Sequence, residues 1–272
     1  MEKIFLAGID LDGTLLRNDK SLSQASVDAI NRAVDRGITV VPITGRPLSG
    51  VPDFIKKLDA LKYIVTSNGA YITDIEKNEI IYSKQLSFDK TLKYISLANS
   101  SGLYCEAFSE GYGYVDSNTM SRHRAELYGT PLWEYITSSR CVVENVYSHF
   151  EENRLCADEI FCIAKSTSQR NAFRSLIEND DDIQYCELEN IYIELTHCDV
   201  DKGRALKRLC TLLNIPIENT IAFGDGENDL SFMKAAGTSV AMKNANPLII
   251  ENADVITETN ENDGVAKILD TL

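Results

Sequence analysis

Basic residues are scarce in this sequence. The chain has 27 Lys and Arg against 41 Asp and Glu, which gives a formal net charge of −14. Broad binding to nucleic acid or to anionic membranes depends on clustered Lys and Arg, so we expect neither as a partner. A ligand that carries phosphate would need local attraction, from a metal ion or from a few fixed cations.

Sequence signals of several other protein classes are also missing. The seven cysteines form no Cys-x-x-Cys pair, which indicates reduced thiols in a cytoplasmic protein. The apolar residues 4–9 follow no basic leader and are too few to span a membrane. The absence of a Gly-x-x-x-x-Gly-Lys-Ser/Thr loop and of a Gly-x-Ser-x-Gly elbow excludes two common designs of hydrolase.

The overall composition is that of an ordinary globular protein. Hydrophobic residues make up 44% of the chain and charged residues 25%. A length of 272 residues exceeds one average domain, so the chain suits either one large α/β unit or a core with an insertion.

Four short apolar runs end in polar residues. An amphipathic stretch at residues 23–36, ending at Gly37, separates the first two runs and predicts a βαβ unit. Ligands of parallel α/β sheets lie outside the carboxyl ends of the strands, so the four polar ends suggest one shared site. The runs are residues 4–9, 38–43, 63–66 and 220–223, and they lead into Asp10, Thr44, Asn68 and Asp225.

The middle of the chain differs in composition and in its pattern of predicted elements. It contains the only Trp, many Tyr, a charged helix-like stretch at residues 121–128 and strand-like pieces at residues 113–115 and 191–193. We therefore expect a catalytic core formed by residues 1–84 and 196–272, with an α+β domain at residues 85–195 inserted into it.

Asp10 and Asp12 are the first candidate site residues. They lie two apart at a strand end, so they project from the same side, and Gly13 lets the backbone turn away. Two such carboxylates can divide the roles of nucleophile and proton donor. An Asx turn is the plainer interpretation of an isolated Asp-x-Asp-Gly. A calcium loop is excluded because Ser21 occupies the position where its Glu is needed.

Further candidates follow the other strand ends. Thr44, Gly45 and Arg46 combine a hydroxyl, a permissive backbone and a cation that suit phosphate oxygens, although alone they are typical of a helix N-cap. Lys202 precedes an amphipathic helix and would by itself be taken for a solvated lysine. The segment at residues 224–229 places three acids and Asn228 after a buried run, and its Asp225 together with Asp10 could hold Mg²⁺.

Four segments together resemble the four motifs of the haloacid dehalogenase superfamily, in the family's order. The resemblance also covers residues 67–70 and the C-terminal tail, and the long insertion resembles the C2-type cap of the Cof-type sugar-phosphatase branch. It implies a Rossmann-like core with a mobile α/β cap. The segments are Asp10-x-Asp12-Gly13-Thr14, Thr44-Gly45-Arg46, Asp201-Lys202-Gly203 and Gly224-Asp225-x-x-Asn228-Asp229.

The resemblance implies a two-step phosphatase mechanism. Asp10 would attack phosphorus to give an aspartyl-phosphate, and Asp12 would protonate the leaving alkoxide and later deprotonate water. The remaining roles implied by the family are phosphate binding by Thr44, Gly45, Lys202 and Asn228, Mg²⁺ binding by Asp10, the Asp12 carbonyl and Asp225, and support from Asp229 and Arg46.

Two rival functions and the substrate stay open at this point. A receiver-like Mg²⁺-binding module shares the acids, the Thr and the Lys, but has no insertion of this size. A phosphotransferase or phosphomutase would use the same nucleophile. The expected substrate is a small phosphorylated metabolite, with a sugar phosphate favoured. In the insertion, Tyr114, Arg122, His123 and Arg124 are candidates to contact it, with solvated positions as the favoured interpretation.

Overall fold

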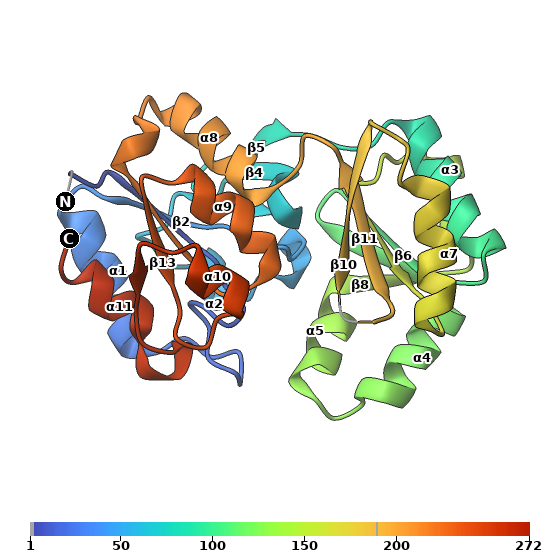
Figure 1. Cartoon of the computed structure of the whole chain (residues 1–272), viewed down its shortest axis with the longest axis horizontal. Helices are drawn as coiled ribbons and strands as arrows, with labels where there is room; N and C mark the ends of the chain where they lie inside the picture. Colours follow the sequence, from blue (N-terminus) through green and yellow to red (C-terminus); the bar gives the residue numbers. More distant parts are fainter. Residues whose placement is uncertain (1–2, 189) are drawn as a thin grey trace. The chain divides into compact units, whose positions relative to one another are not determined.

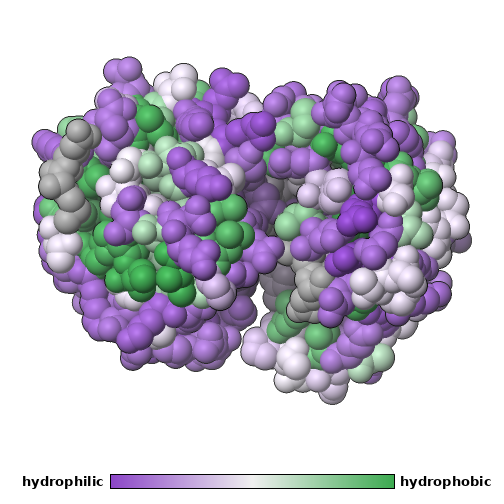
Figure 2. Space-filling view, in the orientation of Figure 1, coloured by the Kyte–Doolittle hydropathy of each residue, from purple (hydrophilic) through white to green (hydrophobic). Residues whose placement is uncertain are grey.

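The computed structural model describes residues 3–188 and 190–272, which form two compact units (Figure 1). The first, here called the core unit, comprises Met1–Gly45, Pro52–Ser83 and Asp201–Leu272. The second, the insert unit, comprises Arg46–Val51 and Lys84–Val200. Hydrophilic residues cover most of the visible surface of each unit (Figure 2).

A five-stranded parallel sheet forms the centre of the core unit. Its strand order is β14-β13-β12-β1-β2, and β1 and β12 are buried along their whole length. Strands buried on both faces require continuous apolar runs, and the predicted runs supply them. The strands are β1 (Leu6–Ile9), β2 (Thr39–Pro42), β12 (Thr220–Gly224), β13 (Thr238–Ala241) and β14 (Val255–Ile256).

Helices flank this sheet, which confirms the predicted α/β fold (Figure 1). The Ser23 hydroxyl caps α1 by accepting the Ser26 N–H, and the helix stops before Gly37, whose φ is +86°. Helix α1 packs against α11, and α8 packs against α9. The helices are α1 (Gln24–Asp35), α2 (Asp53–Lys56), α8 (Lys202–Leu213), α9 (Leu230–Ala235), α10 (Pro247–Glu251) and α11 (Gly264–Leu269).

A short antiparallel sheet continues the core unit beyond β2. Ile43 and Val65 form a parallel bridge between the end of β2 and the first strand of this sheet. Its strands are β3 (Tyr63–Thr66), β4 (Tyr71–Asp74) and β5 (Glu79–Ser83). The single-turn 3₁₀ helices of the chain are η1 (Leu48–Gly50), η2 (Ser67–Gly69), η3 (Ile217–Asn219), η4 (Glu227–Asp229) and η5 (Asn260–Asn262).

The insert unit is built on a six-stranded sheet in the order β10-β11-β9-β6-β7-β8. Its pairs are antiparallel except for β7 and β8, which are parallel. The strands are β6 (Tyr104–Ser109), β7 (Tyr112–Asp116), β8 (Arg140–Val143), β9 (Glu159–Ile163), β10 (Ile183–Leu188) and β11 (Tyr192–His197). The helices are α3 (Phe88–Ser100), α4 (Ser117–Leu127), α5 (Pro131–Ser139), α6 (Val146–Asn153) and α7 (Thr167–Ile177).

One face of the six-stranded sheet packs against α3, α6 and α7. Tyr94, Phe150 and Phe173 from these helices are fully buried against small residues of the sheet such as Ala107 and Cys162. Strand residues alternate between faces, so the neighbours of Ala107 and Cys162 point to the other side of the sheet. The insert unit therefore has its own hydrophobic core.

Two general features concern hydrophobic helices and cysteines. Among the described residues, no helix combines the length and hydrophobicity that crossing a bilayer requires. The seven cysteines are present as free thiols.

Candidate active site

The carboxyl ends of β1, β2 and β12 bring the first candidates to one edge of the parallel sheet. The Asp10 N–H donates to the Phe223 carbonyl at 3.0 Å, and the Ile43 N–H donates to the Ile9 carbonyl at 2.8 Å. Asp10 and Thr44 therefore follow directly on neighbouring strands, and both are buried. This is the edge at which open α/β sheets bind ligands.

Lys202 joins two carboxylates at this edge. Its Nζ lies 2.6 Å from Asp10 Oδ1 and 2.6 Å from Asp229 Oδ1, and all three side chains are buried. Lys202 is the first residue of α8, whose N-cap Asp201 accepts the Arg204 N–H. Asp229 Oδ2 accepts the backbone N–H groups of Asp225 and Gly226 at 2.9 and 3.0 Å. Asp229 thus fixes both the lysine and the loop after β12.

Three carboxyl groups, those of Asp10, Asp225 and Asp229, lie together with the single ammonium of Lys202. Burial raises the pKa of Asp10 well above its ordinary value, and the Lys202 ammonium only partly opposes this. Burial also raises the pKa of Asp225 to about 6, against a hydrogen bond from Thr14 and together with repulsion from Asp229. Burial alone would lower the pKa of Lys202, but Asp10 and Asp229 raise it. One further cation would stabilise the ionised acids.

The carboxylates fit a divalent metal ion. One oxygen each from Asp10, Asp225 and Asp229 lies within 4.8 Å of the others. Both oxygens of Asp229 already accept hydrogen bonds, so Asp10 and Asp225 are the better ligands. Mg²⁺ is typically held by one or two carboxylates, with water and substrate oxygens completing its shell. The donor set therefore suits Mg²⁺.

Gly13 makes room for Asp225. Its φ is +78°, and a Cβ atom at this position would lie 2.2 Å from Asp225 Oδ2. The next residue contributes directly, because the Thr14 hydroxyl donates to Asp225 Oδ1 at 2.9 Å. Glycine at position 13 is required both by the backbone conformation and by this close approach.

Asp12 lies outside the close carboxylate group and has a different partner. Lys20 Nζ lies 2.7 Å from Asp12 Oδ1, and the two side chains are 35% and 38% exposed. Lys20 was not among the sequence candidates. The turn-forming Asn18-Asp19 pair just before it is a signal that the chain reverses there, but not that it returns to Asp12.

Asn68 connects two other segments of the site. Its N–H donates to the Thr44 carbonyl at 3.1 Å, and its Oδ1 accepts the side-chain amide of Asn228 at 3.1 Å. Its side chain also lies against Gly45. Sequence reasoning noted Asn68 as a strand end but assigned it no role at the site.

Arg46, the last of the sequence candidates, belongs to the insert unit. Its guanidinium donates to the Gly50 carbonyl at 2.7 Å and lies 4.6 Å from the centre of the Tyr135 ring. Both of these contacts are made within its own unit.

The expectation that His123 is solvated is wrong. His123 is buried, and its Nε2 lies 2.6 Å from Glu106 Oε1. Arg140 Nε donates to the other oxygen of Glu106 at 2.7 Å. The sequence did not reveal this group because Glu106, His123 and Arg140 come from three separate elements. We call it the Glu106 cluster.

The other insertion candidates are packed to different degrees. Arg122 stacks on Tyr104, with its guanidinium 5.1 Å from the ring centre, and only 13% of its side chain is exposed. Tyr114 is partly buried and makes an edge contact with Phe150. Arg124 is exposed, as expected. Solvation therefore describes Arg124 alone.

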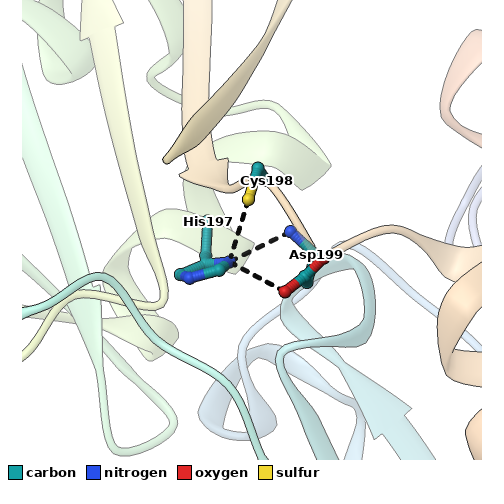
Figure 3. Close-up of side chains that lie close together, drawn as sticks. All are labelled: His197, Cys198 and Asp199. Carbon is teal, nitrogen blue, oxygen red and sulfur yellow. Dashed lines mark hydrogen bonds and ion pairs between the residues drawn. The ribbon is translucent and has the colours of Figure 1, made fainter. Parts of the chain in front are cut away.

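A second group of possible metal ligands lies in the insert unit (Figure 3). His197, Cys198 and Asp199 are consecutive residues at the end of β11. His197 Nδ1 already accepts the Asp199 N–H at 3.0 Å, and Asp199 is exposed. The lone pair of His197 Nδ1 is therefore engaged, so this group is the weaker candidate.

Comparison with known proteins supports the geometric interpretation. A family model described as haloacid dehalogenase-like hydrolase matches residues 8–269. Phosphatase YwpJ of Bacillus subtilis (strain 168) is 30% identical over 285 residues, covering 97% of this chain and 98% of the relative. The 5-amino-6-(5-phospho-D-ribitylamino)uracil phosphatase YcsE of the same organism is 29% identical and covers 98% and 94%.

A solved structure shows the same fold. It is a haloacid dehalogenase-like hydrolase from B. subtilis, which superposes with a TM-score of 0.86 at 29% identity. The match covers 99% of this chain and 100% of that one. The similarity therefore includes both units.

Proposed function

Since this chain belongs to the haloacid dehalogenase-like hydrolase family and is a phosphatase of that superfamily, we propose that it is a Mg²⁺-dependent phosphomonoester hydrolase with Asp10 as its nucleophile. The observation that carries the proposal is the buried contact of Lys202 with Asp10 and Asp229, beside the carboxylate of Asp225. This cluster combines a fixed carboxylate with a fixed cation at the ligand-binding edge of the sheet.

Asp10 attacks the phosphorus of a bound phosphomonoester. Its position at the end of β1 is fixed by the backbone hydrogen bond to Phe223 and by Lys202. The reaction therefore costs little further orientational freedom. The attack forms the bond from an Asp10 oxygen to phosphorus and breaks the bond to the leaving alkoxide. Water then hydrolyses the resulting acyl phosphate.

The obstacle to this attack is repulsion between a carboxylate and a phosphate dianion. Lys202 supplies one positive charge, held by Asp10 and Asp229. A bound Mg²⁺ would supply two more charges and polarise the phosphoryl oxygens. We assign Asp10, Asp225 and the Asp12 carbonyl as the groups that hold it.

Asp12 acts as the general acid and base. Its carboxyl group protonates the leaving oxygen and then accepts a proton from the attacking water. Unlike Asp10, it is partly exposed, and its partner Lys20 is also partly exposed. A carboxyl group that must exchange protons with substrate and water needs this access.

Thr44, Gly45 and Asn228 bind the transferring phosphoryl group. Thr44 and Gly45 follow β2 beside Asp10, and Asn228 follows β12. Hydroxyl, backbone N–H and amide groups are suitable donors to phosphoryl oxygens. We propose small phosphorylated metabolites as substrates, with sugar phosphates first. The ribitylamino compound in the name of YcsE is a second choice.

Phosphate release from a metabolite panel tests the proposal. The panel comprises sugar phosphates, pyridoxal phosphate, flavin mononucleotide and the ribitylamino phosphate, each with Mg²⁺. We expect turnover that EDTA abolishes and added Mg²⁺ restores, and no turnover by Asp10→Asn on any substrate. Activity that survives in Asp10→Asn would exclude Asp10 as nucleophile, and activity that resists EDTA would exclude the metal.

A further inference from the structure

The turn at Ser67–Gly69 has an unusual backbone. All three residues have positive φ, at 48°, 53° and 109°, and the first two are not glycine. Left-handed conformations are unfavourable for a non-glycine residue and persist only where the surroundings fix them. The residues before and after the turn are buried, so this strain is maintained inside the core unit.

The surroundings of this turn are the phosphate-binding parts of the proposed site. The Asn68 N–H donates to the Thr44 carbonyl, and the Asn68 side chain touches Gly45. On its other side, Gly69 lies so close to α8 that a Cβ atom would come within 2.7 Å of the Asp201 carbonyl. The turn therefore packs directly against the residue before Lys202.

The Asn68 side chain adds the third connection. Its Oδ1 accepts the Asn228 side-chain amide at 3.1 Å. Asn228 lies in η4, next to Asp229, which holds Lys202. One turn thus contacts the segments that contain Thr44, Lys202 and Asn228, which are far apart in the sequence.

We propose that Asn68 is a positioning residue that orients the Asn228 amide and the Thr44-Gly45 backbone toward the transferring phosphoryl group. This inference rests on the proposed phosphatase function. Asparagine meets both requirements of the position, because it tolerates the left-handed backbone and carries an acceptor for Asn228. Donors that are fixed in advance stabilise phosphoryl charge without reorganisation during the reaction.

The test separates the side chain from the backbone. Asn68→Gly keeps the left-handed conformation at no steric cost and removes only the amide. Asn78→Gly is the matched control, since Asn78 also has a positive φ of 52° but is exposed in the turn between β4 and β5. The measured quantities are the inhibition constant of inorganic phosphate with Mg²⁺, kcat and KM for p-nitrophenyl phosphate, and Tm.

We expect Asn68→Gly to raise the inhibition constant of phosphate about tenfold, while Tm stays near that of the wild type. A change of this size is expected when a group that donates to a charged ligand loses the hydrogen bond that orients it. Asn228→Ala should weaken phosphate inhibition at least as much, because it removes the amide that Asn68 orients, and the loss in the double variant should be smaller than the two single losses combined. Asn78→Gly should match the wild type.

Each other outcome overturns the inference. If Asn68→Gly has the inhibition constant of the wild type, Asn68 has no positioning role. Additive losses in the double variant exclude the link to Asn228. A wild type that neither hydrolyses the ester nor binds phosphate overturns the proposed function, and this inference with it.

Discussion

Two buried charge clusters, one in each unit, are balanced in opposite ways. In the core unit, Lys202 is surrounded by carboxylates, and the pKa of Asp10 is raised. In the insert unit, Glu106 lies between Arg140 and His123. Burial would raise the pKa of Glu106, but its two basic neighbours lower it to about 2.

The difference indicates what each cluster is for. The Glu106 cluster is satisfied by its own residues, as a structural ion pair must be when it is removed from water. The core cluster has too few cations for its acids, and such an imbalance persists where a ligand supplies the missing charge. Variants that remove one member should therefore affect activity in the core unit and stability in the insert unit.

Lys202→Met should have the largest effect. It removes the ammonium group that contacts both Asp10 and Asp229, so we expect kcat/KM to fall by about 100-fold to 1,000-fold. Lys207→Met changes an exposed lysine on the same helix and should leave kcat/KM within about twofold. Steady-state kinetics on p-nitrophenyl phosphate measures both, and equal values for the two variants would show that Lys202 is not at the site.

Asp12→Asn should separate proton transfer from nucleophilic attack. For an alkyl phosphate, whose leaving group needs a proton, we expect a loss of about 100-fold or more. For p-nitrophenyl phosphate the loss should be much smaller, because nitrophenolate leaves without protonation. The measurement is the ratio of kcat/KM for the two substrates, and an unchanged ratio would indicate a structural role for Asp12.

Glu106→Gln should reduce stability in a pH-dependent way. The pKa of Glu106 falls from an ordinary 4.5 to about 2 in the folded state, so its stabilisation is present above pH 4.5 and is lost as the pH falls toward 2. This shift corresponds to about 3 kcal/mol. We expect the difference in unfolding free energy between wild type and variant to be largest near pH 7 and to shrink below pH 4.5.

Denaturant unfolding at several pH values measures this difference. Glu134→Gln, which changes an exposed residue of the insert unit, should show almost none. A Glu106→Gln difference that is constant from pH 7 to pH 3 would contradict the assignment. A loss of kcat without loss of stability would also remove the contrast between the clusters.

Lys20→Met should have the smallest effect on stability. The Lys20–Asp12 pair is more than one third exposed on both sides, and exposed ion pairs contribute about 0–1 kcal/mol. The unfolding free energy at low and high salt measures this contribution. A destabilisation as large as that of Glu106→Gln would show that the loop before α1 depends on this contact.

Much of the fold could be predicted from local pattern. Three of the four apolar runs located strands of the parallel sheet, and the fourth, at residues 63–66, located β3 of the antiparallel sheet. Ser23 and Gly37 located the ends of α1, because burial and helix capping act over a few neighbouring residues. The structure also brings Asp10, Asp225 and Lys202 together, as strand-end chemistry suggests. Patterns of this kind are readable because each motif adjoins its own strand or helix.

The Glu106 cluster and the contacts of Asn68 could not be predicted, because they join elements that are far apart in the sequence and share no sequence pattern. Nothing near His123 in the sequence indicates Glu106 or Arg140, since the three meet only after strands and helix pack. The hydrogen bond between Asn68 and Asn228 likewise depends on how two loops approach. Charge balance in a buried cluster is therefore visible only in three dimensions.

Gly13 lacks a side chain because a residue distant in the sequence occupies the space beside it. The space its missing side chain leaves is filled by a carboxylate from Asp225, a residue much later in the chain. The position of a charged group at the site thus depends on the size of an uncharged residue, Gly13. Even a methyl group at this position would displace the Asp225 carboxylate by steric overlap, although every acidic and basic residue of the site would still be present.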